Sequence, residues 1–425
     1  MVLLFAMYWS LAQGSGNDLT HALQFGGRQI DAVEIDPVIQ DIGRHYHPDH
    51  PYQDARVIPH LDDGRHFLRT TDHKYDLVIY ALVDSLILHS GYANIRLESY
   101  LFTRQAFSDV KRVLKSDGIF VMYNWFRQGW IVERIVAMAE RTFGCPPVIL
   151  SLPYEQILKA SSPAGFMMII AGCNPRIANA FGEHKTFWLN SVPPQNLHVD
   201  GFALRPEILP PDQQHNFQPI SPTTLIHDAG KVISISDDWP FLYLRGKLIP
   251  DFTIRSMVIL GVLGVGMVYL FLPKGRIAIN SRMFFLGAAF MLLETRAVVQ
   301  MALLFGSTWL VNSGVFFTVL VLILLANLYV LKVQEVRLFW HYVGLLIFLA
   351  VGVLIPIDVF LSGGMLWRYA VPCILALGPM FFAGIIFAAS FRDATSPDLA
   401  FGANIAGSVL GGLAKSFSML LVDGR

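Results

Sequence analysis

A glycine-rich turn, followed about 20 residues later by an acid, is the part of this chain best suited to chemistry. In the segment GSGNDLTHALQFGGRQIDAVEIDP (14–37), Gly14, Ser15 and Gly16 lead into an amphipathic stretch, and a short apolar run then ends on Glu34. Glycines let a backbone turn approach a ligand closely, and the first turn of a helix directs free amides toward it. An acid at the next strand end can accept hydrogen bonds from two ribose hydroxyls. The spacing therefore predicts a site for an adenosine-type cofactor.

Three more residues fall where predicted strands end, namely Asp63, Gly64 and Asp84. The carboxyl ends of parallel strands meet at one edge of a sheet, so we expect these residues to lie near the glycine turn. Asp63 could accept a hydrogen bond from an adenine amino group. Each residue also has a simpler interpretation: the glycines as an ordinary turn, Glu34 as a helix cap, and Asp62 or Asp63 as the cap of the next helix. Their combination favours the cofactor site.

Predicted strands and helices alternate through the first 175 residues. Strands are expected at 2–11, 29–35, 55–59, 75–81, 118–123 and 165–172, and helices at 18–25, 38–46, 62–71, 101–115 and 130–143. This alternation is typical of an α/β Rossmann-like fold, in which a mostly parallel sheet carries helices on both faces.

The density of charged residues changes near Ser256. Of the 32 basic and 32 acidic residues, 16 lie in 256–425 and 48 lie before it. The later apolar runs are long enough to cross a bilayer, which takes about 20 helical residues. Spans are expected at 253–272, 283–305, 309–331, 340–361 and 368–391, with a weaker sixth at 398–421. We therefore predict a Rossmann-like nucleoside-binding domain (1–175), an extension and linker (176–250) and an all-α transmembrane bundle of about five to six helices (251–425).

Composition also bears on partners and location. The formal net charge of zero, without a basic tract, argues against a nucleic-acid partner. The three cysteines, Cys145, Cys173 and Cys373, are too few and too scattered to predict a disulfide framework or a metal site. Lysines and arginines on the two sides of the first span balance, so they do not set its orientation. We expect a multi-pass protein of the inner membrane whose soluble half faces the cytoplasm, because adenosine cofactors are found there. Nothing indicates the oligomeric state.

Polar and aromatic residues in the second half suggest two further features. Trp239, Phe241 and Tyr243 precede the first span and predict an interfacial aromatic belt. Glu294 and Arg296 lie well inside the second span, where each needs a partner. Candidate partners are Asn312, Asn327, Asp358 and Asn404. A structural polar core and a substrate path both remain open interpretations.

Four motifs in order, GSGND, DAVEIDP, DDGRHFL and YDLVI, resemble the spermidine synthase-like branch of the S-adenosylmethionine-dependent methyltransferase superfamily. The resemblance covers roughly residues 8–172, and later stretches such as DDWPFLYLRGKLIP resemble bacterial integral-membrane proteins that carry such a domain. It implies S-adenosylmethionine or its decarboxylated form as the cofactor. The implied cofactor contacts are Gly14, Ser15, Gly16, Asp18, Glu34, Ile35, Asp63 and Gly64.

One departure from this family concerns the catalytic base. Similar aminopropyltransferases have an acid-Ser-Ser-acid run after the fourth strand, and its first Asp helps to deprotonate the attacking amine; this chain has Ala81 there. Because a protonated amine cannot attack a sulfonium carbon, loss of the base should cost about two to four orders of magnitude in rate. Asp84 remains as the candidate catalytic residue. His89 is either a substitute base or a surface-loop histidine.

Three functions follow from these residues. The first is a membrane-anchored transferase that uses S-adenosylmethionine or its decarboxylated form and an unknown acceptor, such as an amine. The second is a catalytically weakened nucleoside-binding domain that senses the cofactor and regulates a transporter-like membrane bundle. The third, an NAD-type oxidoreductase, fits less well because the turn lacks the third glycine.

Overall fold

The computed structural model describes most of the chain as two compact units, 1–245 and 246–425. The described residues are 2–6, 16–82, 99–152, 155–177, 187–190, 217–220, 222–227, 232–246, 251–271, 280–306, 308–333, 335–355, 359 and 365–421. Each unit is treated by itself below.

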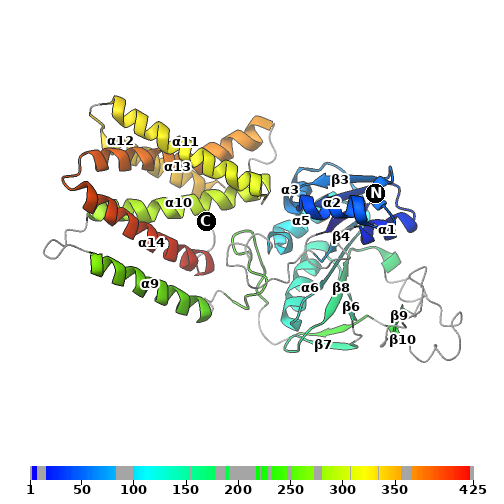
Figure 1. The fold of residues 1–425 in the computed structure, drawn as a ribbon. Helices are drawn as coiled ribbons and strands as arrows, with labels where there is room; N and C mark the ends of the chain where they lie inside the picture. The colour runs from blue at the N-terminus through cyan, green and yellow to red at the C-terminus, as the bar shows by residue number, and fades with distance from the viewer. Residues whose placement is uncertain are drawn as a thin grey trace. The chain divides into compact units, whose positions relative to one another are not determined.

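The first unit is built on a seven-stranded sheet in the order β3-β2-β1-β4-β5-β8-β6 (Figure 1). The strands are β1 (Val2–Ala6), β2 (Ile30–Glu34), β3 (Val57–Leu61), β4 (Tyr75–Ala81), β5 (Leu114–Trp125), β6 (Val148–Leu152) and β8 (Phe166–Ala171). Strands β1 to β5 pair in parallel, and β8 runs antiparallel to β5 and β6. The predicted mostly parallel, methyltransferase-type sheet is therefore confirmed.

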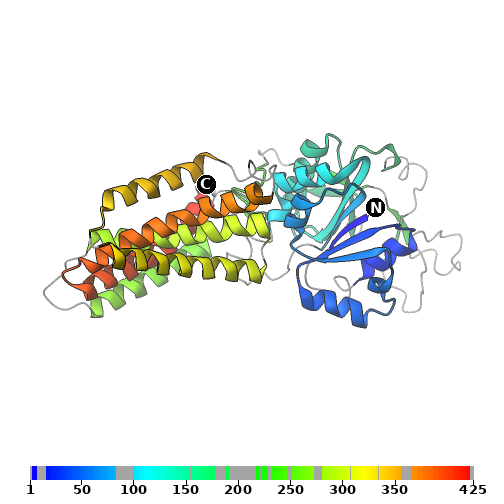
Figure 2. The ribbon, with the colours of Figure 1, turned by 90° about the horizontal axis from the view of Figure 1, so that it is seen from above.

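Helices cover both faces of this sheet (Figure 2). They are α1 (Asn17–Gln24), α2 (Pro37–Tyr46), α3 (Gly64–Thr70), α5 (Arg104–Val113) and α6 (Gly129–Phe143), with short 3-10 turns at Pro51–Gln53 and Ser99–Phe102. Leu19 of α1 packs on Ile30, Ala32 and Val57 on one face. A larger apolar core joins α3, α5 and α6 to the sheet and includes Phe107. The two cores hold the sheet between layers, as burial of both faces of a parallel sheet requires.

Several short strands were not predicted. Strand β6 lies at the sheet edge, β7 (Ile157–Lys159) pairs in parallel with β11 (Thr224–Ile226), and β9 (Phe187–Asn190) pairs antiparallel with β10 (Phe217–Ile220). Strand β6 follows two prolines and is only five residues long. The first strand was expected to reach residue 11, but its described part ends at Ala6.

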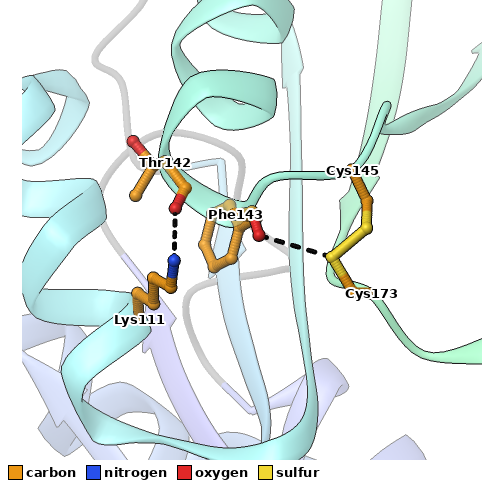
Figure 3. Close-up of a disulfide and its surroundings, with 5 residues drawn as sticks. All are labelled: Lys111, Thr142, Phe143, Cys145 and Cys173. Carbon is orange, nitrogen blue, oxygen red and sulfur yellow. Dashed lines mark hydrogen bonds between the residues drawn. A yellow bond between two sulfur atoms is a disulfide. The ribbon is translucent and has the colours of Figure 1, made fainter.

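A disulfide joins Cys145 and Cys173, a single pairing that the sequence, which indicated no disulfide framework, did not predict (Figure 3). Cys145 follows the left-handed Gly144 that ends α6, and Cys173 follows Gly172 at the end of β8. The two Cα atoms lie 5.5 Å apart although 28 positions separate them in sequence. Because β8 returns antiparallel beside β5, the two element ends meet, and spacing alone cannot reveal that meeting.

Residues 232–246, which we call the strap, pack into the first unit. Trp239, Phe241 and Leu242 are each at most 2% exposed. The guanidinium of Arg134 in α6 donates hydrogen bonds to the carbonyls of residues 241, 242, 244 and 245, and it lies 4.8 Å from the ring centroid of Trp130. Trp239 and Phe241 are therefore core residues, and the predicted interfacial belt is incorrect for them.

The second unit consists of long helices. They are α9 (Asp251–Phe271), α10 (Ser281–Phe305), α11 (Trp309–Lys332), α12 (Leu338–Leu354), α13 (Met365–Arg392) and α14 (Pro397–Leu421). Three stretches, Ser281–Phe305, Val311–Lys332 and Ala370–Arg392, are long and apolar enough to cross a membrane. Helix α12 ends earlier than the expected span 340–361 because the residue before Pro356 is disfavoured in a helix.

The polar residues inside these helices mostly bind backbone carbonyls. Arg296 donates to the carbonyl of Gly352 in the last turn of α12, where helical carbonyls lack partners. Asn327 binds Ile323 in its own helix, and Asn404 binds Met283. Among the proposed partners of Glu294 and Arg296, these two asparagines are therefore engaged elsewhere, and Asp358 lies outside the described residues.

Candidate functional site

The predicted site lies at the carboxyl ends of three neighbouring strands. In the ladders, Ala6 at the end of β1 pairs with Glu34 on one side and with Ala81 on the other. Glu34 pairs in turn with Leu61, and its carbonyl accepts a hydrogen bond from the Asp62 amide at 3.0 Å. The ends of β2 and β4 therefore flank the end of β1, and the end of β3 lies on the far side of β2. Gly14 and Ser15 of the expected cofactor loop lie outside the described residues.

Gly16 begins the first helix in a conformation that favours glycine. Its φ of +129° lies in a region that other residues rarely adopt, and a Cβ atom there would come within 2.8 Å of the Pro51 ring. Asn17 next to it is hydrogen-bonded to His47 at 2.8 Å. No side chain among the described residues caps α1, so its first amides are suited to bind a ligand. The described part of the turn thus fits the anion- or dipole-binding role that was predicted.

Glu34 is buried at the end of β2, with 2% of its surface exposed. Its Oε1 accepts a hydrogen bond from the amide of Asp36 at 2.9 Å. Its Oε2 is buried and has no hydrogen-bond partner among the described residues. Burial raises the pKa of this carboxyl to about 8, against the lowering effect of the Asp36 and Ile35 amides. At neutral pH the free carboxyl therefore holds a proton, and a ligand donor that reaches Oε2 would favour its ionised, accepting form.

Tyr52 and Ile35 are two further residues near Glu34. Tyr52 packs against the apolar cluster around Leu19. The pKa of Tyr52 is raised to about 12, first by burial and then by the charge of Glu34. Ile35 follows Glu34 directly and is half-buried. A hydrogen bond between a ligand hydroxyl and the buried Oε2 would be strong, because little water competes for that oxygen.

Asp63 and Gly64 start helix α3. Asp63 is buried and its Oδ1 accepts hydrogen bonds from the amides of Arg65 at 2.8 Å and His66 at 3.1 Å. Asp62 binds the His66 ring and the Asp63 amide. The capping role that we held as the simpler interpretation of Asp63 is therefore present. A contact with adenine stays a prediction.

Sequence reasoning missed Tyr123 in β5. Its hydroxyl donates to Oδ1 of Asp18 at 2.5 Å. The other carboxylate oxygen of Asp18 is buried without a partner among the described residues, and burial raises the pKa of Asp18. Both residues line a cavity of about 710 Å³ together with His21, Ile79, Val121 and Met168. The signal was available, because Tyr123 lies near the carboxyl end of a predicted strand.

The end of β4 carries no acid up to Leu82. Ala81 is buried there, and Leu82 follows with a φ of +47°, a left-handed conformation that costs energy for a branched residue. The Leu82 amide donates to the carbonyl of Tyr123, which ties this turn to β5. Asp84 and His89, the candidate bases, lie outside the described residues.

Comparison with known proteins assigns this region to a domain type. Residues 14–156 match the family model of the spermine/spermidine synthase domain. A polyamine aminopropyltransferase of Clostridium perfringens is 36% identical over 95 residues, which are 22% of this chain and 30% of that protein. One from Hamiltonella defensa is 30% identical over 115 residues, 26% of this chain and 37% of that protein. The chain thus spans about a third of the length of these relatives.

Solved structures with a similar arrangement include two kinds of transferase fold. The spermidine synthase from Thermotoga maritima aligns with a TM-score of 0.29 at 15% identity, covering 40% of this chain and 52% of that one. Human methyltransferase-like protein 13 in complex with SAH aligns with a TM-score of 0.30 at 15% identity, covering 41% and 72%. The fold assignment itself rests on the sheet order of this chain. With the sequence match over residues 14–156, it shows that the N-terminal half of this chain carries a spermidine synthase-like domain.

Proposed function

We propose that this chain is a membrane-anchored, transferase-like protein whose N-terminal domain binds S-adenosylmethionine or its decarboxylated form. The observation that carries the proposal is the unpartnered Oε2 of Glu34, buried at the end of β2 inside a spermidine synthase-like domain. A ribose diol supplies the donors that this oxygen lacks. The open first turn of α1 would face the tail of the cofactor, and the start of α3 would face its base.

Transfer in such a site needs positioning and removal of one proton. The acceptor nitrogen attacks a carbon bonded to the cationic sulfur, a C–N bond forms as the C–S bond breaks, and the neutral thioether leaves. The amine proton passes to a base, for which Asp84 is our candidate. Asp18, which accepts a hydrogen bond from Tyr123, adds a carboxyl group to the wall of the cavity that could bind an amine donor.

A second function is favoured by Ala81. Without a carboxylate at this position, the domain would bind cofactor and transfer slowly, as expected of a sensor that regulates the helical unit. Replacing Ala81 by Asp distinguishes the transferase from the sensor. If the protein is an aminopropyltransferase with a weakened base, A81D should raise turnover of diamines by about 100- to 10,000-fold, and A81N should not. An unchanged rate in A81D would favour the sensor.

The helical unit supports membrane anchoring. Within the described part of the chain, three helices are long and apolar enough to span a bilayer. We propose that the protein lies in the inner membrane with its soluble unit toward the cytoplasm, where the cofactor is found. Membrane flotation of the full chain tests the anchoring, and protease access to the soluble unit in sealed vesicles tests the orientation.

Equilibrium binding tests the cofactor. Purified full-length protein is titrated calorimetrically with S-adenosylmethionine, with its decarboxylated form and with 5′-methylthioadenosine, the nucleoside part that both share. Binding of at least one, at a stoichiometry near one, is expected. Absence of heat and of thermal stabilisation with all three would reject both the transferase and the sensor.

A further inference from the structure

Asp237 of the strap lies between two helices of the nucleoside-binding unit. Its Oδ2 accepts hydrogen bonds from Arg65 and Arg69 of α3, both at 3.1 Å. Its Oδ1 accepts from the hydroxyl of Thr103, the residue that caps α5, at 2.5 Å. The Asp237 amide donates to the side chain of Gln105 at 3.1 Å. One carboxylate thus holds the strap to both α3 and α5.

Asp237 and Asp109 both contact the buried guanidinium groups of Arg65 and Arg69. The side chains of these arginines are 3% and 6% exposed, and Asp109 of α5 also pairs with Arg112. Loss of the Asp237 charge would leave the two buried guanidinium groups with one carboxylate fewer, which is unfavourable in a site shielded from water. Helix α3 would then have to shift or admit water.

Helix α3 is the element that carries the presumed base-binding end of the site. Arg65 connects this end of the site to the strap. Its backbone amide donates to the capping carboxylate of Asp63, and its guanidinium group donates to Asp237. The position of Asp63 and Gly64 relative to Glu34 therefore depends on where the Arg65 side chain is held. The neighbouring cap residue of α5, Thr103, is held by the same carboxylate.

We propose that Asp237 is a positioning residue of the nucleoside site, acting through Arg65 on the amino end of α3. Because binding free energies are reciprocal, a nucleoside that favours this position of α3 also tightens the attachment of the strap. The strap leads along the chain into α9, which begins at Asp251. Occupancy of the site and attachment of the strap are thus linked through one ion cluster within the first unit. This inference rests on the proposed nucleoside binding.

The test compares two strap variants of the full-length protein, with 5′-methylthioadenosine as the probe. Asp237→Asn keeps the shape of the side chain and removes its charge, and its Kd should rise about 5- to 100-fold, the usual range of coupling between sites. Asp237→Glu, which restores the charge, should recover most of the affinity. Leu242→Ala is the matched control, since Leu242 is a buried strap residue in the apolar core and makes no part of the ion cluster. It should lower stability and leave Kd within about twofold.

A second measurement uses the wild-type protein alone and therefore does not depend on whether Asp237→Asn folds. Saturating 5′-methylthioadenosine should slow hydrogen exchange at the strap amides of Asp237 and Trp239, which are bonded to Gln105 and Ser236. Three results would each overturn the proposal. The first is an equal Kd for wild type and Asp237→Asn, and the second is an equal loss of probe affinity in Asp237→Asn and Leu242→Ala. The third is unchanged hydrogen exchange in the strap of a protein that binds the probe. If folded wild-type protein does not bind the probe, the nucleoside assignment itself fails.

Discussion

The carboxyl of Glu34 accepts the amide of Asp36 with one oxygen and keeps the other buried without a described partner. A buried acceptor that lacks a donor is costly, and native proteins rarely keep one without a reason. Because this one ends β2 beside the start of α1 and the strand end of β3, a bound diol is the reason that best fits the position. Its energetics lead to three of the predictions below.

Replacing Glu34 by Ala should weaken binding of 5′-methylthioadenosine by about 2 to 4 kcal/mol, because two hydrogen bonds to a charged group are lost. Calorimetric titration of the full-length variant measures this. Asp41→Ala is the matched control, since Asp41 is an exposed acid on the adjacent helix α2 that pairs with His45 of the same helix. Equal affinities of Glu34→Ala and wild type would remove Glu34 from the site.

Stability of the free protein should fall as the pH rises from about 4.5 to about 8. The pKa of Glu34 is raised by burial to about 8, whereas the unfolded chain has the ordinary value near 4.5. Between these limits the folded state holds a proton that the unfolded state has lost, so its advantage declines with pH and is fully present only below about 4.5. Urea unfolding at several pH values measures the slope, and Glu34→Gln should flatten it. The same slope in both proteins would assign it to other groups.

Nucleoside binding at pH 7 should release protons. Ribose hydroxyls favour the ionised carboxylate of Glu34, so its pKa drops on binding from about 8 toward its ordinary range. Calorimetry in two buffers of different ionisation enthalpy counts the protons, with close to one expected per ligand. Proton uptake, or no exchange of protons, would contradict this role.

Replacing Arg134 by Met should destabilise the first unit by at least about 3 kcal/mol. Four strap carbonyls would lose a charged donor, and buried acceptors without donors are costly. Burial lowers the pKa of Arg134 to about 10, so the group is still protonated at neutral pH. Trp130 and Trp239, which stack near this guanidinium, report unfolding by fluorescence.

The control for Arg134 lies on the same helix. Arg141 is exposed near the end of α6, and Arg141→Ala should change stability by no more than about 0.5 kcal/mol. Similar effects of the two substitutions would show that the strap is held by its apolar residues alone.

Replacing Gly407 by Ala should destabilise the helical unit. An added Cβ would overlap the carbonyl of Phe284 in α10, so α10 and α14 would have to separate, and overpacking of this kind costs about 1 to 3 kcal/mol. Gly402 lies on the same helix with open space around it, and Gly402→Ala should be neutral or stabilising. Thermal unfolding in detergent compares the two. A larger loss of thermal stability in Gly402→Ala than in Gly407→Ala would contradict the close contact between α10 and α14 at Gly407.

The alternation of apolar strands and amphipathic helices predicted most of the first unit, because a parallel sheet places its elements in chain order. The same reasoning predicts a role for Glu34, since this acid lies at the carboxyl end of a strand. Tyr123 also lies near the carboxyl end of a strand, but a tyrosine in an apolar strand has the pattern of a core residue. The carboxylate of Asp63 had two possible roles, and only coordinates could show that it caps α3.

The strap and the second-unit polar groups show what sequence patterns cannot supply. An aromatic run before an apolar helix has the composition of a membrane interface, yet Trp239 and Phe241 are buried because Arg134 draws the strap carbonyls to α6. Arg296 donates to a backbone carbonyl of α12, although side-chain partners were expected, because the carbonyls in the last turn of a helix lack intrahelical donors. Both outcomes depend on tertiary neighbours that no local spacing encodes.

The Cys145–Cys173 bond makes the robustness of the first unit depend on cellular redox chemistry. Closing a loop of this length removes freedom from the unfolded chain and is worth about 3 to 4 kcal/mol. Glutathione and thioredoxin hold cytoplasmic thiols reduced, so a unit facing the cytoplasm would ordinarily do without that contribution. Reduction of the pair would remove the covalent link between the ends of α6 and β8.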